Sequence, residues 1–302
     1  MKSPQHYLTG EELSSQQTHS ILKKALLLKK NRHQNNLEPP LQGQHLALLF
    51  DKPSLRTRFS FTIAMRELGG NVVESLSDTR KKEQPEDQAK VLGGYCQAIM
   101  VRTFADDYLE RMGAASPVSI INGLSNLHHP CQILADMLTL LEVYGALSGL
   151  TLAYIGDGNN ILHSLLLIAP TLGVNVHYCC PESRGPDASI LARASKNANP
   201  GTIKAFSSPE QAVNTADAVY TDTWTSMGFE GQNHEYLFNG FQVDEQLMAK
   251  AKTQAVFMHC LPMERGKEVS HTLPDLPCSV IFHQSENRLH VQKALLLHLL
   301  AA

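Results

Sequence analysis

Two arginines lie in the segment FDKPSLRTRFSF, where an apolar run gives way to a helical pattern. We expect Ser54 to cap that helix, with Arg56 and Thr57 in its first turn. Free N–H groups already give a helix start partial positive charge, so the added arginines favour binding of an anion there. Guanidinium groups, hydroxyls and free N–H groups together suit a phosphate. A capped helix whose arginines are simply solvated is the alternative interpretation.

Two more loops with polar side chains follow later apolar runs. Arg102 ends the run in MVRTF, and the segment NGLSNLHHPCQILAD places His129 and Gln132 within one turn of another helix start. Imidazole and amide groups supply neutral donors and acceptors that suit a carbonyl or amide ligand. Taken singly, Arg102 would more often be a surface arginine and His129 a structural histidine.

Polar side chains also stand at element ends in the second half of the chain. The segment YIGDGNNILHS follows an apolar run, but the third glycine of a dinucleotide-binding motif falls on Ile161. Asn159 and Asn160 instead offer polar groups at a helix start. In VYTDTWTSMGFE, Asp222 ends a run just before the SMG turn, where a carboxylate can hold an ammonium group.

Cys260 ends the last apolar run, in VFMHCLPMERG, just before a proline turn. A cysteine there is most often a buried, inert thiol, and only the neighbouring polar loops suggest a role in chemistry. Three potential metal ligands, His128, His129 and Cys131, form a weaker pattern, since adjacent histidines cannot readily face one ion. We therefore predict no metal site.

Short apolar runs that alternate with helical patterns must position these groups. Expected strands span 45–50, 70–76, 96–102 and 118–121, then 150–155, 174–180, 203–206, 218–223 and 255–259. A first helix with Thr9 as N-cap should reach about Arg32, and later helices span 56–68, 85–94, 106–113, about 130–144 and about 286–300. This alternation predicts an α/β fold with two doubly wound parallel sheets, whose ligands bind beyond the carboxyl ends of the strands.

Length and composition set further limits. A chain of 302 residues suggests two domains, each large enough for its own core. A net charge of −3 with 18% charged residues gives no argument for nucleic acid or an acidic membrane surface, so a small-molecule partner is expected. The six cysteines contain no C-x-x-C pair, which fits free thiols in a reducing cytosol. No run reaches the ~20 apolar residues of a membrane span, so we predict a soluble, cytoplasmic protein.

Together, seven segments resemble the aspartate/ornithine carbamoyltransferase superfamily. They are SLRTR at 54–58, RTF at 102–104, HPCQ at 129–132, GDGNN at 156–160, DTWTSMG at 222–228, HCLP at 259–262 and ENRLHVQKALL at 286–296. Their order matches that of the superfamily, and the resemblance covers nearly the whole chain. Cys260 and the SMG turn resemble the ornithine branch, since an aspartate enzyme would have leucine at this place and arginine-rich contacts for a dicarboxylate.

The resemblance implies transfer of the carbamoyl group of carbamoyl phosphate to the δ-amine of L-ornithine, giving L-citrulline and phosphate. The reaction would serve arginine biosynthesis or, in reverse, arginine catabolism. The active site would lie in the cleft between two domains. Residues 1–135, rejoined by a helix at about 286–302, would bind carbamoyl phosphate, and residues 136–285 would bind ornithine. No metal and no organic cofactor is implied.

The same resemblance assigns roles to individual residues. Phosphate would be held by Ser54, the Leu55 backbone, Arg56, Thr57 and Arg102. The carbamoyl end would be held by His129, Gln132, Arg288 and the backbone at Cys260 and Leu261. Ornithine would be held by Asn160, Asp222, Ser226 and Met227. Arg56, Arg102 and His129 would stabilise developing charge, while Cys260 and Asp222 would orient the amine and accept its proton without a covalent intermediate.

Relatives of this kind share active sites within a homotrimer, or a multiple of trimers. A loop after the second strand reaches the neighbouring subunit and carries a glutamine or histidine. Here SLSDTRKKEQPED is shorter, and its segment 77–83 has Arg80, Lys81 and Lys82 instead. Glu264 in HCLPMERG is a second departure, which alters the local charge.

Several alternatives remain open on sequence grounds. A dehydrogenase would use GDGNN for a dinucleotide but would leave SLRTR and HCLP without a role. A catalytically silent paralogue would keep the binding motifs. A carbamoyltransferase for putrescine or an acylated ornithine is the nearest enzymatic alternative. Asp222 and the SMG turn suit a free α-amino acid, which argues against either of these two acceptors.

Overall fold

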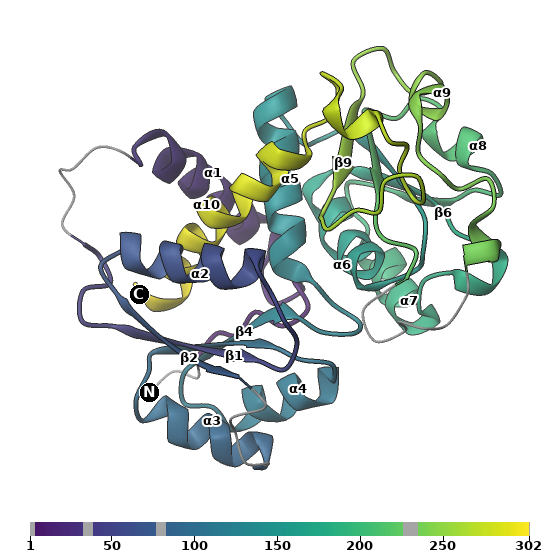
Figure 1. The fold of residues 1–302 in the computed structure, drawn as a ribbon. Helices are drawn as coiled ribbons and strands as arrows, with labels where there is room; N and C mark the ends of the chain where they lie inside the picture. The colour runs from purple at the N-terminus through teal and green to yellow at the C-terminus, as the bar shows by residue number, and fades with distance from the viewer. Residues whose placement is uncertain (1–3, 33–38, 77–82, 226–234, 302) are drawn as a thin grey trace. The chain divides into compact units, whose positions relative to one another are not determined.

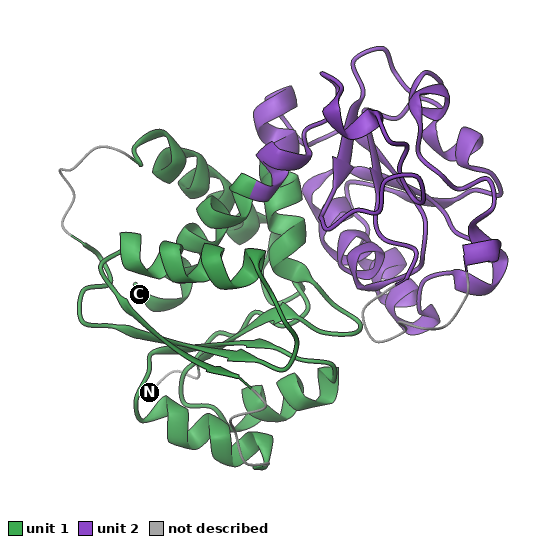
Figure 2. Cartoon of the chain, in the orientation of Figure 1, with its two compact units in different colours: residues 1–138, 286–302 green, residues 139–285 purple. Residues whose placement is uncertain are grey.

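The computed structural model of the chain describes residues 4–32, 39–76, 83–225 and 235–301. The chain forms two compact units, coloured separately in Figure 2. Unit 1 comprises Met1–Leu138 and Glu286–Ala302, and unit 2 comprises Thr139–Ser285. The chain passes from unit 1 to unit 2 within helix α5 (Pro130–Tyr144) and returns within helix α10 (Ile281–Leu300).

Unit 1 alternates strands with helices, as the sequence predicts. Its strands are β1 (His45–Phe50), β2 (Asn71–Leu76), β3 (Ala98–Arg102) and β4 (Ser119–Leu124). Its helices besides α5 and α10 are α1 (Ser15–Lys30), α2 (Arg56–Glu67), α3 (Pro85–Gly93) and α4 (Asp106–Ala115). The strands pair in parallel in the order β2-β1-β3-β4. In Figure 1, α3 and α4 lie on one face of this sheet and α2 on the other.

Unit 2 contains a second parallel sheet, in the order β7-β6-β5-β8-β9. Its strands are β5 (Thr151–Ile155), β6 (Asn175–Cys179), β7 (Ile203–Ala205), β8 (Ala218–Thr221) and β9 (Val256–His259). Its α-helices are α6 (Asn160–Ile168), α7 (Ala188–Asn197), α8 (Pro209–Val213) and α9 (Glu245–Met248). Short 3-10 helices are η2 (Ala169–Leu172), η3 (Glu182–Arg184), η4 (Glu235–Phe238) and η5 (Leu273–Asp275). The predicted α/β class with two parallel sheets is confirmed.

Burial explains why continuous apolar runs became strands. β3, inside the sheet, and β4, at one edge, are both buried at every position, as expected where helices cover both faces of a parallel sheet. Ala47, Leu49, Ile99, Val101 and Ile120 belong to one core cluster of unit 1. β2, at the other edge, has no buried position.

The first helix begins later than predicted. α1 starts at Ser15, and its N-cap is Ser14 with Gln17 in a capping box. Thr9 is not a cap, because Gly10 takes a positive φ of 102° there. The carboxylate of Glu12 instead accepts the N–H groups of Thr9 and Gly10, both at 2.9 Å, and closes a separate turn.

The last helix begins earlier than predicted. α10 starts at Ile281, five residues before the expected start. Ile281 is fully buried in the core cluster of unit 2, together with Val243, Phe257 and Leu273. An apolar contact of this kind stabilises an extra helical turn that sequence periodicity alone does not reveal.

Two simple predictions concern the whole chain. All six cysteines are free thiols, as expected. Of the helices in the described ranges, none joins the length and the apolar character that a membrane crossing requires.

Candidate active site

The residues predicted to hold phosphate lie at the carboxyl ends of the strands of unit 1. β1 and β3 are neighbours where the strand order changes direction, and doubly wound sheets bind ligands at such a point. Arg56 and Thr57 begin α2 after β1, Arg102 ends β3, and His129 directly precedes α5 after β4. The fold therefore brings residues far apart in sequence to one edge of the sheet.

Arg288, on α10, joins two of these loops. Its guanidinium donates through Nη1 to Oε1 of Gln132 and through Nη2 to the hydroxyl of Thr57, both at 2.7 Å. All three side chains are buried. Because a buried donor that loses its acceptor is costly, these bonds fix the orientation of the guanidinium. The name unit 1 cluster is used below for Arg56, Thr57, Arg102, His129, Gln132 and Arg288.

His129 is buried among the arginines of this cluster. Burial, and then the positive charges of Arg288, Arg102 and Arg56, hold the pKa of His129 well below its usual value. The imidazole is therefore neutral near pH 7, when it can donate one hydrogen bond and accept another. The same three charges that disfavour an imidazolium would stabilise a bound anion.

Ser54 does not cap α2, contrary to the prediction. The N-cap is Leu55, which has helical backbone angles (φ −81°, ψ −63°) and whose side chain makes no capping hydrogen bond. The helix begins one residue too late for a Ser54 cap. The start of α2 therefore lacks an N-cap side chain, and it lies beside the half-buried Ser54 and Arg56.

Arg58, the second arginine of the segment, lies outside this cluster. It forms an ion pair with Glu74 of β2 at 2.7 Å. Its guanidinium also lies over the Phe50 ring, 5.3 Å from the centroid. These contacts tie α2 to the edge of the sheet and give Arg58 a structural role.

In unit 2, polar residues follow β5 and β8, which are neighbours where that strand order changes direction. Asn159 caps α6, since its side-chain oxygen accepts the N–H of Ile161 at 3.0 Å. Its amide donates to Oδ2 of Asp222 at 2.8 Å. Asp222 also accepts from the Cys260 thiol, with Sγ 2.9 Å from Oδ1. The name unit 2 cluster is used below for Asn159, Asn160, Asp222 and Cys260.

The backbone next to Cys260 is strained. Leu261 has a φ of 60°, a value that a leucine rarely adopts. Its N–H donates to Nδ1 of His259 at 2.9 Å, which holds the turn in this conformation. Backbone strain of this kind is concentrated at functional sites in proteins.

A salt bridge and a close approach of two loops hold the GDGNN segment. Asp157, 3% exposed, accepts two hydrogen bonds from Arg184, the closer donor lying at 2.5 Å. A side chain at Gly158 would meet the backbone carbonyl of Gly185 at 2.3 Å. The second glycine of GDGNN is therefore needed for packing between loops, which agrees with an incomplete dinucleotide motif.

One group of side chains could be considered for a metal. Ligand atoms of Asp222, His259 and Cys260 lie within 4.8 Å of one another. However, Nδ1 of His259 accepts from Leu261, and Nε2 lies 3.2 Å from a Glu268 carboxylate oxygen. Both ring nitrogens are thus engaged, so His259 offers no free ligand atom.

The weaker metal pattern from the sequence does not form a site. His128 Nδ1 bonds to Asp106 at 2.8 Å, whereas the Cys131 thiol donates to the Asn122 carbonyl at 3.4 Å. His129 belongs instead to the unit 1 cluster. Among the described residues, these three do not form a group with metal-binding spacing.

Two sets of predicted residues cannot be placed. Ser226 and Met227, predicted to bind ornithine, lie outside the described residues. So do Arg80, Lys81 and Lys82 of the segment 77–83.

Three supporting contacts were not anticipated. Gln132 donates to Asp136 at 2.9 Å, and this pair could have been found from its i, i+4 spacing on a helix. The hydrogen bond from Asn159 to Asp222 joins distant parts of the sequence, as does the pair of Arg184 and Asp157. No local pattern identifies such partners.

Comparison with known proteins gives two matches to protein-family models. Residues 5–142 match the model described as aspartate/ornithine carbamoyltransferase, carbamoyl-P binding domain. Residues 148–299 match the model described as aspartate/ornithine carbamoyltransferase, Asp/Orn binding domain. Together the two models cover most of the chain.

Relatives that match over nearly the whole chain agree with the family models. An ornithine carbamoyltransferase of Parasynechococcus marenigrum is 44% identical over 300 residues, which cover 97% of this chain and 93% of that protein. The ornithine carbamoyltransferase structure from Pyrococcus furiosus has 38% identity and a TM-score of 0.95, covering 99% of this chain and 98% of that one. A structure of an N-acetyl-L-ornithine transcarbamylase has 30% identity and a TM-score of 0.86, covering 97% and 99% of the two chains. The chain therefore belongs to the aspartate/ornithine carbamoyltransferase family.

Proposed function

We propose that the chain transfers the carbamoyl group of carbamoyl phosphate to the δ-amine of L-ornithine, yielding L-citrulline and phosphate. The observation that carries the proposal is the buried arrangement in which Arg288 contacts both Thr57 and Gln132, beside a neutral His129. Cationic donors suit the phosphate, and neutral donors suit the carbamoyl carbonyl. Both kinds of donor occur in one cluster.

Carbamoyl phosphate would bind mainly to unit 1. Its phosphate would contact Ser54, the Leu55 backbone, Arg56, Thr57 and Arg102, and its carbamoyl end would contact His129, Gln132, Arg288 and the backbone at Cys260 and Leu261. The start of α2 supports the phosphate position, since its N-cap has no capping side chain and the positive end of a helix dipole favours an anion.

Ornithine would bind to unit 2. Asn160, Asp222, Ser226 and Met227 would hold its α-amino and α-carboxyl groups. The support among described residues is a buried carboxylate, Asp222, which already accepts two hydrogen bonds and has capacity to accept an ammonium group. Because the amine must attack the carbamoyl carbon, the proposal requires both clusters to act on the same pair of substrates.

The reaction forms an N–C bond and breaks the bond between the carbamoyl carbon and the phosphate oxygen. A neutral δ-amine attacks, the carbonyl oxygen gains negative charge, and phosphate leaves with its bonding electrons. Arg56, Arg102 and His129 would donate to the oxygens on which charge develops, and preorganised donors of this kind are often the largest catalytic contribution.

The attacking amine must first lose a proton, because an alkylammonium has a pKa near 10.4 in water, so only about one molecule in 2,500 is neutral at pH 7. The hydrogen-bonded pair of Cys260 and Asp222 would orient the amine and accept that proton. Neither residue needs to form a covalent bond with the carbamoyl group.

We further propose a homotrimer, or a multiple of trimers, in which neighbouring subunits share each active site. Segment 77–83 would reach the adjacent subunit. The supporting observation is the exposure of three large apolar side chains, Leu55 and Phe59 at the start of α2 and Val73 on the edge strand β2, which are 68%, 57% and 60% exposed. Exposed apolar side chains and unprotected edge strands are common at interfaces. The six free thiols support a cytoplasmic location.

A citrulline assay tests the proposal. Purified protein would be given carbamoyl phosphate with ornithine, putrescine, N-acetylornithine or aspartate, and the carbamoylated product would be detected colorimetrically. We expect product with ornithine and little with the other three acceptors. Preference for putrescine or N-acetylornithine would replace the proposed acceptor, whereas no product with any acceptor would indicate a binding protein without activity.

A further inference from the structure

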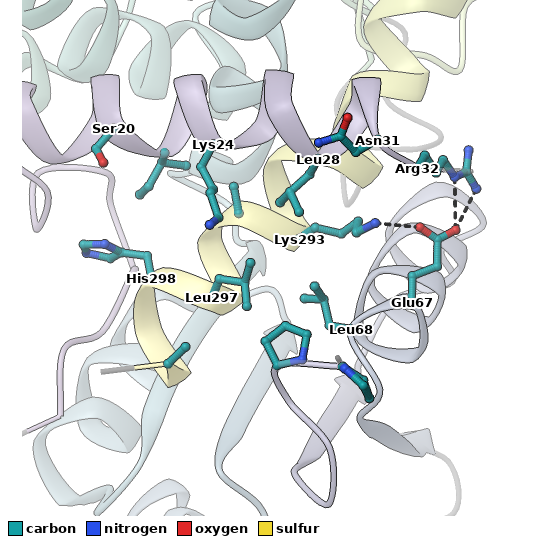
Figure 3. A pocket seen from close by; sticks show the side chains of 15 residues that line it. Ser20, Lys24, Leu28, Asn31, Arg32, Glu67, Leu68, Lys293, Leu297 and His298 are labelled. Atoms are coloured by element: carbon teal, nitrogen blue, oxygen red, sulfur yellow. Dashed lines mark hydrogen bonds and ion pairs between the residues drawn. The ribbon is translucent and has the colours of Figure 1, made fainter. Parts of the chain in front are cut away.

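A pocket lies within unit 1, at the end of α2 opposite to Arg56 and Thr57 and along the part of α10 that follows Arg288. Its volume is about 710 Å³, within the range of small-molecule sites. The pocket is lined by α1, by α10, by the end of α2 and by Pro39 and Pro40. Figure 3 shows Lys24 extending from α1 toward α10 across this space.

Positive charge exceeds negative charge in this pocket. Lys24, Arg32 and Lys293 are its cationic side chains, and Glu67 is its carboxylate. Glu67 accepts from Arg32 at 2.9 Å and from Lys293 at 2.8 Å, as Figure 3 shows. One carboxylate therefore faces three cations.

The burial of Lys293 makes the excess of positive charge in the pocket important for ligand binding. Its side chain is 6% exposed, and lysines are rarely buried to that extent unless paired. An ammonium group has three N–H donors, and Glu67 occupies one of them in the structure. An anionic ligand could accept from the others, because the pocket gives it access to the buried charge.

The rest of the lining is apolar. Ile21, Leu68 and Ala294 are buried side chains that border the pocket, and Leu28 and Leu297 complete its apolar part. A purely inorganic ion would leave this surface uncovered. A ligand with a negative head and an apolar body matches both parts of the lining.

We infer that this pocket binds a small amphipathic organic anion and that its occupant alters the affinity of the unit 1 cluster for phosphate. The coupling follows from two contacts between the same helices. Glu67 of α2 bonds to Lys293 of α10 at the pocket, and Thr57 of α2 bonds to Arg288 of α10 in the cluster. A ligand that competes with Glu67 for Lys293 changes the first contact and so biases the second. The coupling rests on the proposed function, whereas the binding does not.

Binding is tested with 8-anilinonaphthalene-1-sulfonate and its neutral analogue N-phenyl-1-naphthylamine. Fluorescence titrations of the whole protein would give a dissociation constant for each probe. We expect tighter binding of the anion, and Lys24→Gln should weaken the anion alone, by about two- to fivefold as befits one exposed charge. Lys23→Gln is the matched control, since Lys23 is the neighbouring exposed lysine and does not line the pocket.

Two results would overturn the binding site. One is equal affinity for the charged and neutral probes, which indicates an apolar crevice only. The other is an equal loss in Lys23→Gln and Lys24→Gln, which indicates general surface charge. Neither measurement needs substrate or turnover, so an inactive protein would still test the binding site.

Coupling is tested by calorimetry with inorganic phosphate, with and without the anionic probe. We expect the phosphate dissociation constant to change about fivefold or more, and phosphate to change probe affinity by the same factor. Arg56→Ala should bind the probe normally while losing the coupling. An unchanged phosphate affinity at saturating probe would refute the coupling.

Discussion

Arg288 donates a hydrogen bond of 2.7 Å to the hydroxyl of Thr57, although 231 positions separate the two residues in sequence. The contact links α10 to the start of α2, where the proposed phosphate ligands lie. It also explains why the ENRLHVQKALL segment matters for a site whose other residues of unit 1 come from the first half of the chain.

Thr57→Val should weaken carbamoyl phosphate binding. Valine keeps the shape of threonine but leaves a buried donor of Arg288 without its acceptor, at a cost of about 1–3 kcal/mol. We expect a raised KM for carbamoyl phosphate and a lowered unfolding midpoint. Thr62→Val on the same helix is the control, and equal effects of the two substitutions would argue against a specific role for Thr57.

Arg56→Ala should lower kcat by about a hundredfold or more, as expected when one preorganised donor to a developing charge is lost. Steady-state citrulline production measures the effect, and circular dichroism checks the fold. Arg66→Ala, which removes an exposed arginine near the other end of α2, should have little effect. Near-normal turnover in Arg56→Ala would refute the assignment.

Cys260→Ser should reduce the use of ornithine without abolishing activity, because the thiol is proposed to orient the amine and not to form a bond. Mass spectrometry under turnover should find no carbamoyl group on Cys260. Cys278→Ser is the control thiol substitution. A carbamoylated Cys260 that forms and decays at the catalytic rate would establish a different mechanism.

His129 should make stability depend on pH. Its pKa is lowered in the folded state, so the unfolded chain binds a proton at this residue more readily. The contribution to stability is therefore complete above the usual histidine pKa of about 6.5 and is lost as pH falls below it. The midpoint of thermal unfolding should fall more between pH 7 and pH 5 in the wild type than in His129→Gln. Parallel curves would contradict the assignment.

Shared sites can be tested by mixing two inactive variants. One is Arg56→Ala, and the other replaces Arg80, Lys81 and Lys82 by alanine. After denaturation and reassembly in equal amounts, about three quarters of the rings are mixed, each with one intact site in three, so activity should return to about a quarter of wild type by ring symmetry. If mixed trimers form and their activity does not exceed the average activity of the two parent variants, the active sites are not shared.

Much of the fold follows from sequence periodicity, because buried parallel strands read as continuous apolar runs. The strand HLALLF and the strand AIMVR were predicted near their observed bounds for that reason. Positions just after strands also identified Arg56, Asp222 and Cys260 as polar groups on the ligand side of each sheet. Their roles came from the family resemblance and stay predictions.

Other features depend on contacts that no local pattern contains. Ser54 looked like a helix cap, but the helical angles of Leu55 moved the helix start by one residue. Thr9 failed as a cap because Glu12 formed a competing turn. The hydrogen bond between Asn159 and Asp222 depends on tertiary structure, since two strands must first pair.

Synthesis on the ribosome delivers all of unit 2 before it delivers the part of α10 that belongs to unit 1. A nascent chain that has reached Ser285 lacks Arg288 and Lys293, the partners of Thr57, Gln132 and Glu67. Domains generally fold as units during translation. Unit 2 can therefore complete its folding before unit 1. The synthesis of unit 1 begins earlier, but unit 1 lacks its last helix until the end of the chain has been made.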